Sequence, residues 1–331
     1  MDLTVAVHAL YKGLDQAVQG LLVPGRVRPA IDPGCDLAWP LHDYHLGGSP
    51  RRYGNRFDFD EKGVLVFFIN KGDRWIYAPT LIFNEAGGML ARWLDQGDEA
   101  ALRGFRTQMD WACENQVKAG GQRGAWVHHV RRYSAFTFKP PWVNASAQGK
   151  GVSLLLRAWI LTGEERYREA ALMALGPFER DVAEGGVRLH LDDGRVFYET
   201  YPSTPPSLLI NGFIRALLGF RDVSVFTGDA AAGRVWSEGV ETVRAILPRY
   251  DTGFWTRYDL REGTFHVHSK SYHDLTINNM ILLHRLTGDP FFRDYADRFT
   301  GYTQSRWCYF RALACKAAWR ATRLNLNADV A

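Results

Sequence analysis

The segment 198–207 places three titratable side chains within four residues, in the order Tyr198, Glu199 and Tyr201. Three prolines follow them, namely Pro202, Pro205 and Pro206. Proline fixes its own φ angle and moves the residue before it out of the helical region. We therefore expect an extended, rigid segment whose side chains serve a site rather than a surface. Proton transfer is the chemistry open to these side chains.

Two further clusters contain a tyrosine beside a charged or titratable side chain. Tyr258 lies three residues before Arg261, and Tyr272 directly precedes His273. The ordinary pKa of tyrosine is about 10, so its hydroxyl normally donates a proton. A nearby arginine lowers that pKa and lets the hydroxyl cycle between donor and acceptor. Taken singly, each tyrosine also fits a core aromatic residue with a hydrogen-bonded hydroxyl.

Together the three clusters resemble the C-terminal domain of the D-glucuronyl C5-epimerases, which convert glucuronate to iduronate within heparosan and heparan chains. The stretch 142–149, Trp-Val-Asn-Ala-Ser-Ala-Gln-Gly, looks like the family's Trp-x-x-Ala-x-Ala-Gln-Gly. Asp251-Thr252-Gly253 precedes Tyr258, and Asn278 follows Tyr272, much as in the family. The similarity covers roughly residues 76 to 305, and the order of its motifs makes it fairly specific.

The resemblance implies an (α/α) barrel, a homodimer and a set of site residues. In the family, the tyrosines that match Tyr201, Tyr258 and Tyr272 belong to the active site, and the last serves as an acid/base. Arg261 matches an arginine that is a candidate clamp for the substrate carboxylate through bidentate geometry. The further candidates for substrate binding are Tyr198, Thr200, Asn211, Trp142, Gln148, Arg131, Lys139, His273 and Asn278.

One position departs from the family pattern. Animal epimerases have two consecutive glutamates before the Tyr-Pro pair, and the second is the general base. Here Glu199 matches the first, and Thr200 replaces the second. Threonine cannot deprotonate a carbon acid, so either Glu199, Tyr201 or Tyr198 takes the role, or the chain is a binder or an enzyme of altered chemistry. Neighbours in an extended segment point to opposite sides, so Glu199 is not a free replacement.

Epimerisation at C5 removes a proton from the carbon next to a carboxylate and returns one to the opposite face. It requires a base, an acid, and cations or donors that stabilise the developing enolate charge. It needs no metal or nucleotide in principle, so we expect no cofactor. We predict an isomerase that converts D-glucuronate to L-iduronate in a heparosan-like, anionic polysaccharide. The alternatives are a uronate polysaccharide lyase or hydrolase on the same fold, and a non-catalytic polysaccharide-binding protein.

Four turns along the chain share one pattern, in which a glycine precedes an acidic residue. The glycines are Gly97, Gly163, Gly228 and Gly288, spaced 66, 65 and 60 residues apart. Each glycine is expected to end one helix, and each acid to lie in the first turn of the next. Amphipathic helices follow, as at 101–114, 167–175 and 291–299. Helical hairpins at a long period form an open array or a closed ring. We favour a closed (α/α) toroid, because the candidate site residues fall in the long loops between hairpins.

Residues 1–75 differ in character from the rest. Prolines interrupt them, and short apolar runs such as 64–69 stand between the interruptions. We expect an N-terminal extension with a β-hairpin near Phe57 to Ile76 that turns at residues 60–63. Residues 76–331 would then form the (α/α)-barrel catalytic domain.

Composition excludes several classes of protein. The 331 residues are 46% hydrophobic, which is ample for a buried core, and the net charge of +4 is too small to argue for nucleic acid. No run of 18 apolar residues is present, so we expect no membrane span. The first residues, Met-Asp-Leu-Thr, lack the basic and apolar regions of a signal peptide, so we expect a cytoplasmic protein.

Two groups of side chains remain open to more than one interpretation. The pairs His128-His129 and His266-x-His268 lack a carboxylate or cysteine at matching spacing, so we predict polar loop histidines and no metal site. Six basic residues lie in one stretch without a nearby acid, and they fit a solvated face or, as the resemblance favours, a groove for an anionic polymer. They are Arg123, Arg131, Arg132, Lys139, Lys150 and Arg157.

Overall fold

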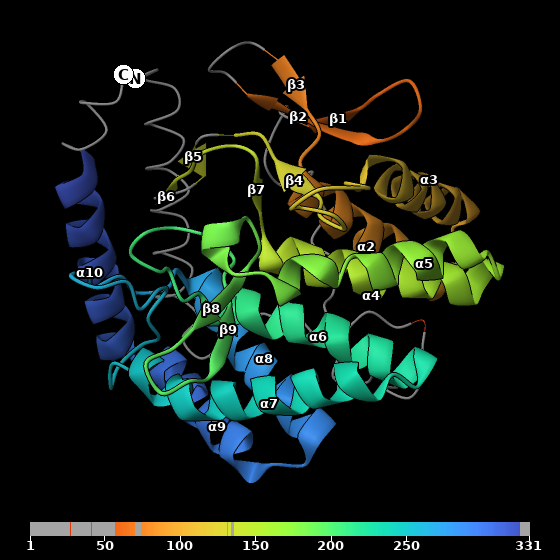
Figure 1. The fold of residues 1–331 in the computed structure, drawn as a ribbon. Helices are drawn as coiled ribbons and strands as arrows, with labels where there is room; N and C mark the ends of the chain where they lie inside the picture. Colours follow the sequence, from red (N-terminus) through yellow and green to blue (C-terminus); the bar gives the residue numbers. More distant parts are fainter. Residues whose placement is uncertain are drawn as a thin grey trace. The chain divides into compact units, whose positions relative to one another are not determined.

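The computed structural model describes residues 57–69, 74–130, 132–133 and 136–324, together with residues 27 and 41. This part of the chain is mainly helical (Figure 1). It divides into two compact units. The N-terminal unit contains the described residues from 31 to 245, and the C-terminal unit contains those from 246 onward. The domain boundary predicted at 75/76 stays a prediction.

The N-terminal unit begins with a small antiparallel sheet of three strands. Strands β1 (Phe57–Phe59), β2 (Leu65–Ile69) and β3 (Arg74–Ile76) lie in that order. The turn between β1 and β2 is held by Asp60, whose Oδ1 accepts from the main-chain N–H groups of Lys62 (3.0 Å) and Val64 (2.8 Å). The predicted hairpin is therefore present with its turn where expected, and β3 adds a third strand.

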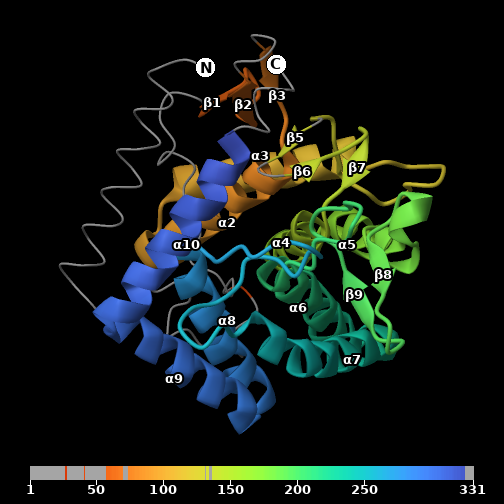
Figure 2. The same cartoon turned by 90° about the vertical axis from the view of Figure 1, so that its left-hand side faces the viewer.

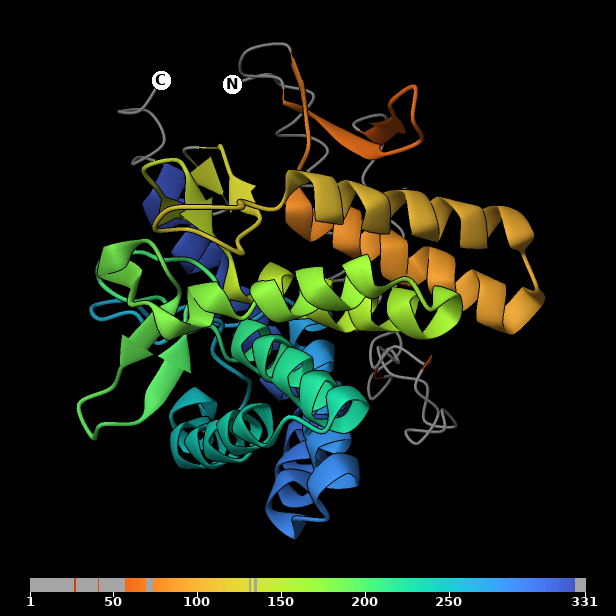
Figure 3. The same ribbon diagram turned by 45° about the vertical axis from the view of Figure 1, so that its right-hand side comes forward.

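Helices of this unit are joined as hairpins, and Figure 3 shows the first hairpin in orange and gold. The paired helices are α2 (Pro79–Gln96) with α3 (Glu99–Asn115), α4 (Ala145–Thr162) with α5 (Glu165–Met173), and α6 (Ile210–Thr227) with α7 (Ala230–Ile246). Short strands lie in the connections and form three two-stranded pairs: β4 (Val127–His128) with β7 (Trp142–Val143), β5 (Arg132–Tyr133) with β6 (Phe136–Thr137), and β8 (Arg188–His190) with β9 (Val196–Tyr198). The connections also contain two 3-10 turns, η2 (Gly176–Glu179) and η3 (Val182–Glu184).

The C-terminal unit contains the 3-10 turn η4 (Leu247–Tyr250) and helices α8 (Lys270–Thr287), α9 (Pro290–Gln304) and α10 (Arg306–Leu324). Figure 2 shows α8, α9 and α10 in blue; α9 packs against both of the others. The loop 251–269 between η4 and α8 buries Trp255 and Val267 against Tyr309 and Ala312 of α10. Asp251 fastens the start of this loop, because it accepts hydrogen bonds from the Gly253 N–H and from the Tyr302 hydroxyl, both at 2.8 Å.

The repeated turn predicted from the sequence is confirmed, with one difference. All four glycines lie in the left-handed region, with φ between 67° and 75°. The acids, however, stand just before the next helix rather than within its first turn. Asp98, Asp229 and Asp289 each accept a hydrogen bond from a main-chain N–H of the following helix (2.9–3.0 Å). A side-chain oxygen there satisfies a donor that the helix leaves open, so capping as well as the dipole explains these three turns, whereas Glu164 makes no capping hydrogen bond.

Helices α4 and α6 touch through glycine. A Cβ added to Gly149 would lie 2.5 Å from the Ala216 Cα, and one added to Gly219 would lie 2.8 Å from the Gly149 carbonyl oxygen. Next to this contact Arg157 donates to the Asp222 carboxylate (2.6 Å) and to the Ser153 carbonyl (2.8 Å). Both charged groups are almost completely buried. The ion pair therefore joins α4 to α6 inside the core.

This pairing corrects part of the predicted basic groove. Arg157 and Lys150 are buried in α4, whereas Arg123 and Lys139 are exposed. Arg131 and the side chain of Arg132 lie outside the described residues. The sequence pattern failed here because an acid distant in sequence, Asp222, neutralises Arg157 across the helix contact.

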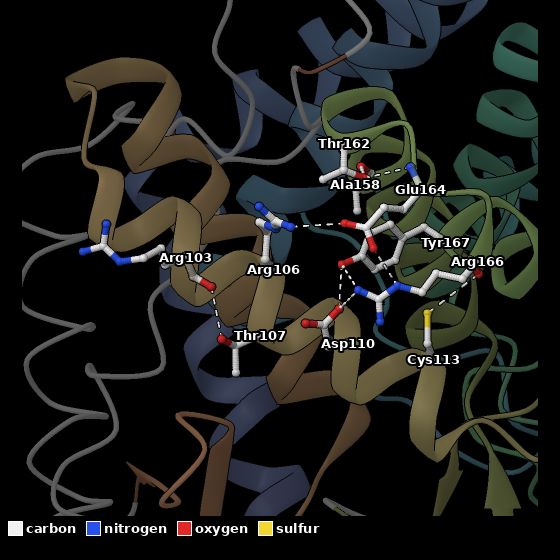
Figure 4. Close-up of polar contacts among 10 residues, drawn as sticks. All are labelled: Arg103, Arg106, Thr107, Asp110, Cys113, Ala158, Thr162, Glu164, Arg166 and Tyr167. Atoms are coloured by element: carbon white, nitrogen blue, oxygen red, sulfur yellow. Dashed lines mark hydrogen bonds and ion pairs between the residues drawn. The ribbon is translucent and has the colours of Figure 1, made fainter.

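Helices α3 and α5 are linked at the surface by a polar network (Figure 4). Arg166 donates to Asp110 (2.7 Å) and to Glu164 (2.8 Å), and the Tyr167 hydroxyl donates to Asp110 (2.6 Å). Burial and the Asp110 hydrogen bond raise the pKa of Tyr167. Exposed ion pairs contribute little to stability, so the network mainly orients the two helices.

Within the described part of the chain, no helix has an apolar stretch long enough to cross a membrane.

We expect Gly149→Ala to destabilise the protein by about 1–3 kcal/mol, because the added methyl group must push α6 away from α4. Gly301→Ala is the matched control, since Gly301 lies in α9 with no atom within 4 Å of the added Cβ. The control should be neutral or more stable by about 0.5–1 kcal/mol, because alanine favours helix. Urea unfolding midpoints measure both effects; equal midpoints for the two variants would contradict the glycine contact.

Candidate functional site

The loop and helix that follow η4 bring two predicted tyrosines together in the C-terminal unit. The rings of Tyr258 and Tyr272 meet edge to face, with centroids 5.6 Å apart. Tyr258 is 7% exposed, whereas Tyr272 is 47% exposed. One member of the pair is thus held by its surroundings, and the other is open to a ligand from solvent.

The backbone of the loop explains why Tyr258 has histidines as neighbours. The Tyr258 N–H donates to the His266 carbonyl (2.7 Å), and the His268 N–H donates to the Thr256 carbonyl (2.9 Å). The two short segments therefore run antiparallel, and alternate residues share one face. The imidazoles of His266 and His268 lie on the Tyr258 side, with ring centroids 4.6 Å and 5.5 Å from that of Tyr258.

A buried carboxylate lies beneath this face. Asp259 accepts hydrogen bonds from His266 Nδ1 (3.0 Å) and from the Thr264 hydroxyl (3.0 Å). The Arg261 guanidinium lies 3.9 Å from its Oδ2 atom. Burial alone would raise the pKa of Asp259, but the hydrogen bonds from His266 and Thr264, with the charge of Arg261, bring it below the usual value. Asp259 is therefore an anion at neutral pH.

Both histidines after Tyr258 are buried, which corrects the prediction of polar loop histidines. Burial lowers the pKa of His268 well below its usual value. Its Nδ1 atom lies 2.9 Å from the Thr256 hydroxyl oxygen, which also contacts His273 Nδ1 at 2.8 Å. His268 is therefore a neutral ring in a hydrogen-bonded network. His128 is likewise buried, against Trp142.

His273 belongs to the core rather than to an open site. Its Nε2 atom lies 3.1 Å from the Phe299 carbonyl of α9, and its ring stacks on Trp255 at 3.8 Å. Burial lowers the pKa of His273 to about 3. The neutral ring ties the start of α8 to α9 and so fixes the position of its neighbour Tyr272. A role in direct substrate binding has no support in this geometry.

In the N-terminal unit, Glu199 is buried and holds the proline-rich segment. The Ser207 hydroxyl donates to its Oε2 atom, and the Leu208 N–H donates to its Oε1 atom (2.9 Å). Leu208 has a φ of 50°, a left-handed conformation that leucine seldom adopts. The carboxylate thus stabilises an unfavourable turn.

The Thr200 side chain points away from the Glu199 carboxylate and packs against the start of α6. It is 6% exposed, and a Cβ at Gly212 would lie 1.7 Å from its hydroxyl oxygen. The two residues therefore fit only because position 212 has no side chain. A glutamate at the buried position 200 would be longer and charged, so it would need either a new partner or a displaced α6. Asn211, next to Gly212, is partly exposed.

Tyr201 is buried among aromatic rings. Its ring centroid lies 4.8 Å from that of Phe136, 5.8 Å from that of Phe138 and 6.2 Å from that of Trp142. Trp142 donates from its indole N–H to the Val130 carbonyl (2.8 Å). These contacts hold Tyr201 in one place beside the predicted motif residue Trp142.

Three other predicted site residues are held within the protein. Burial raises the pKa of Tyr198 to about 12, and its ring packs on Phe220. Gln148 is fully buried; its amide donates to the carbonyls of residues 124 and 174 (2.6 and 3.0 Å) and accepts from the N–H of residue 126 (3.2 Å). Asn278 donates to the Asp274 carbonyl (2.7 Å). These contacts favour structural roles. Lys139 is exposed, and Arg131 lies outside the described residues.

Lys316 of α10 also contacts the Tyr258 cluster, although it was not among the residues predicted from the sequence. Its Nζ atom lies 2.5 Å from His266 Nε2 and 3.1 Å from the Val267 carbonyl oxygen. Burial lowers its pKa to about 7. No motif surrounds Lys316 in the sequence, so only the packing of α10 on the loop could identify it. Across the described residues, no cluster of three or more His, Cys, Asp or Glu side chains could hold a metal ion.

A surface cleft of about 950 Å³ lies elsewhere in the N-terminal unit. It is lined by the β1–β2 turn, Tyr77 and α3, including the acids Asp60, Glu61, Asp110 and Glu114. None of the predicted site residues lines it. Its acids would repel an anionic polymer, so we do not assign the substrate to it.

Comparisons with known proteins agree with the family resemblance. The D-glucuronyl C5-epimerase of Caenorhabditis elegans is 32% identical over 232 residues, covering 64% of this chain and 37% of that protein. An uncharacterized protein of Methanocaldococcus jannaschii is 31% identical over 166 residues, covering 49% of this chain and 53% of that protein. The chain thus covers about half or less of the length of each relative.

A solved structure supports the fold class. The structure of cellobiose 2-epimerase from Spirochaeta thermophila superposes with a TM-score of 0.50 and 15% identity, covering 73% of this chain and 63% of that chain. At this identity the likeness concerns the fold alone. It confirms the predicted class, a mainly α fold of the (α/α) toroid type with a β-hairpin in the N-terminal part.

Residues 120–301, more than half of the chain, match the family described as D-glucuronyl C5-epimerase C-terminus. The matched range includes the segment 198–207, the Tyr258 loop and Tyr272. On this match, the chain belongs to the D-glucuronyl C5-epimerase C-terminus family.

Proposed function

We propose that this chain epimerises D-glucuronate to L-iduronate at C5 within a heparosan-like polysaccharide. The observation that carries the proposal is the pairing of a buried Tyr258 with an exposed Tyr272, within the range that matches the epimerase family. Membership of the family supports an epimerase, and the name of the Caenorhabditis elegans relative supports glucuronate as the sugar.

Each residue of the C-terminal cluster has a role in this proposal. The exposed hydroxyl of Tyr272 exchanges a proton with C5, and Tyr258 supports it as a second proton carrier. Arg261, whose side chain is 12% exposed, binds the substrate carboxylate and stabilises the charge that develops on it as the C5 proton leaves. Asp259 stays ionised, and its carboxylate restrains the Arg261 guanidinium.

We propose different roles for the two candidates in the segment 198–207. The carboxylate of Glu199 already accepts from Ser207 and Leu208, so both of its oxygens are engaged within the segment. Glu199 therefore holds the segment in shape. Tyr201, fixed by its aromatic neighbours, is the proton carrier of this segment.

A second candidate function is polysaccharide binding without catalysis. Two observations favour it: Thr200 fills the place of a family carboxylate, and Glu199 is buried with both oxygens occupied. A homodimer and a cytoplasmic location stay predictions for either function.

Heparosan incubated with the protein in deuterated water separates the possibilities. An epimerase incorporates deuterium at C5 and forms iduronate without cleaving the chain, as followed by NMR. A lyase shares the first step but produces unsaturated chain ends, and a hydrolase produces new reducing ends. Heparosan that binds without C5 exchange or cleavage would support the binding protein and contradict the epimerase.

We expect Tyr272→Phe to reduce C5 exchange by at least about a hundredfold, since removal of a general acid or base typically costs about 10²–10⁴ in rate. The ring and its contact with Tyr258 are retained, so the unfolding midpoint should hardly change. Deuterium incorporation and urea unfolding are measured on the same preparations. Near-normal exchange by the folded variant would remove Tyr272 from the mechanism.

Glu199→Gln should mainly lower stability, whereas Tyr201→Phe should mainly lower C5 exchange. Glu199→Gln weakens the hold on Leu208, so we expect a lower unfolding midpoint with less than about a tenfold loss of exchange. Tyr201→Phe keeps the aromatic packing and should lose at least about a hundredfold in exchange. Ser207→Ala serves as the control for Glu199→Gln, because it removes one donor and leaves the carboxylate. Abolished exchange in Glu199→Gln alone would instead make Glu199 the base.

A further inference from the structure

A continuous chain of hydrogen bonds links Asp259 to α10. Asp259 is an anion, so His266 Nδ1 must carry the proton that it shares with the carboxylate (3.0 Å). The neutral ring then has a lone pair on Nε2, which accepts from Lys316 Nζ at 2.5 Å. The carboxylate thus selects the tautomer of His266, and that tautomer holds the lysine.

Aromatic rings fix this arrangement on both sides. The His266 ring stacks on Trp319 of α10 with centroids 3.6 Å apart and planes 3° from parallel, and Tyr258 packs on it as well. Lys316 Nζ lies 5.6 Å from the centroid of the Tyr258 ring and 5.2 Å from that of Trp319. The lysine is therefore held at a defined distance from the ring of a proposed proton carrier.

We propose that Lys316 is a positioning residue of the site: its ammonium group, held by His266, stabilises the phenolate that Tyr258 forms during proton transfer. The inference rests on the proposed epimerase function. It goes beyond the family match, because α10 follows residue 301, where that match ends. A positive charge beside the ring favours the ionised form of a tyrosine.

The surroundings of Lys316 decide how its charge depends on pH. The ionisable groups that act on it come from the loop and from α10 itself: Tyr258, Asp259, His266 and His268 from the loop, and Arg320 from α10. Burial and then Arg320 lower the pKa of Lys316 to about 7, while Asp259 opposes them. The ammonium form is therefore present below about pH 7 and is lost as the pH rises through that value.

The test compares C5 exchange on heparosan across pH for the wild type, Lys316→Met and Lys316→Arg. Lys316→Met should lower kcat at least about tenfold, with KM changed less than about threefold, because the lysine acts on Tyr258 and not on the polymer. Lys316→Arg keeps a permanent charge and should restore part of kcat. We expect exchange by the wild type to decline above about pH 7, and this decline to be absent in Lys316→Arg.

Arg306→Met is the matched control, since it removes one positive charge from the exposed start of α10, ten residues from Lys316. It should leave kcat and the pH profile unchanged. Unfolding midpoints show whether each variant is folded; if Lys316→Met is not, the pH profile of Lys316→Arg decides.

The outcomes separate this inference from the proposed function. Exchange by the wild type with an unchanged rate and pH profile in both Lys316 variants would overturn the role of Lys316 and leave the epimerase proposal standing. A wild type that exchanges no C5 proton would overturn both. Equal losses in Lys316→Met and Lys316→Arg, with the decline above pH 7 retained, would show a packing role and contradict the electrostatic one.

Discussion

Buried carboxylates need partners, and in this protein three such partnerships fix segments that carry predicted site residues. An unpaired buried charge costs far more than most single contacts contribute, so the chain folds where the charge is compensated. Asp222 compensates Arg157 and joins α4 to α6. Glu199 is satisfied by Ser207 and Leu208 and thereby shapes the segment 198–207. Asp259 is satisfied by His266, which places the imidazole beneath Tyr258.

Local signals in the sequence predicted the repeated part of the fold. The left-handed glycines and the capping acids after them act within a few residues, so their spacing alone indicated helical hairpins. The hairpin near residue 60 was predictable for the same reason, because Asp60 caps its own turn. The prediction of a basic groove was partly wrong because the burial of a basic side chain depends on residues that are distant in the sequence. Arg157 is inside the core through a helix contact that nothing near it in the sequence announces.

The candidate site likewise contains residues that the sequence could predict and residues that it could not. The tyrosine motifs were recognisable because residue type and order define them, and the structure brings Tyr258 and Tyr272 together. Their supporting side chains were not recognisable. His266 and Lys316 are 50 residues apart and meet only because Trp319 and the loop pack on each other. Similarly, Gln148 and His273 occupy motif positions, yet their polar atoms bond within the protein. A motif therefore mixes candidate site residues with residues whose polar groups are satisfied within the protein.

The substitution at position 200 is coupled to its neighbourhood. The hydroxyl of Thr200 lies so close to Gly212 that no side chain fits there. A glutamate would be longer and charged, and at this buried position it would need either a new partner or a displaced α6. Restoring the family residue alone would therefore strain the fold before it supplied a base. Under the proposed function, the proton carrier of this segment is therefore a different side chain, and Tyr201 is fixed among Phe136, Phe138 and Trp142.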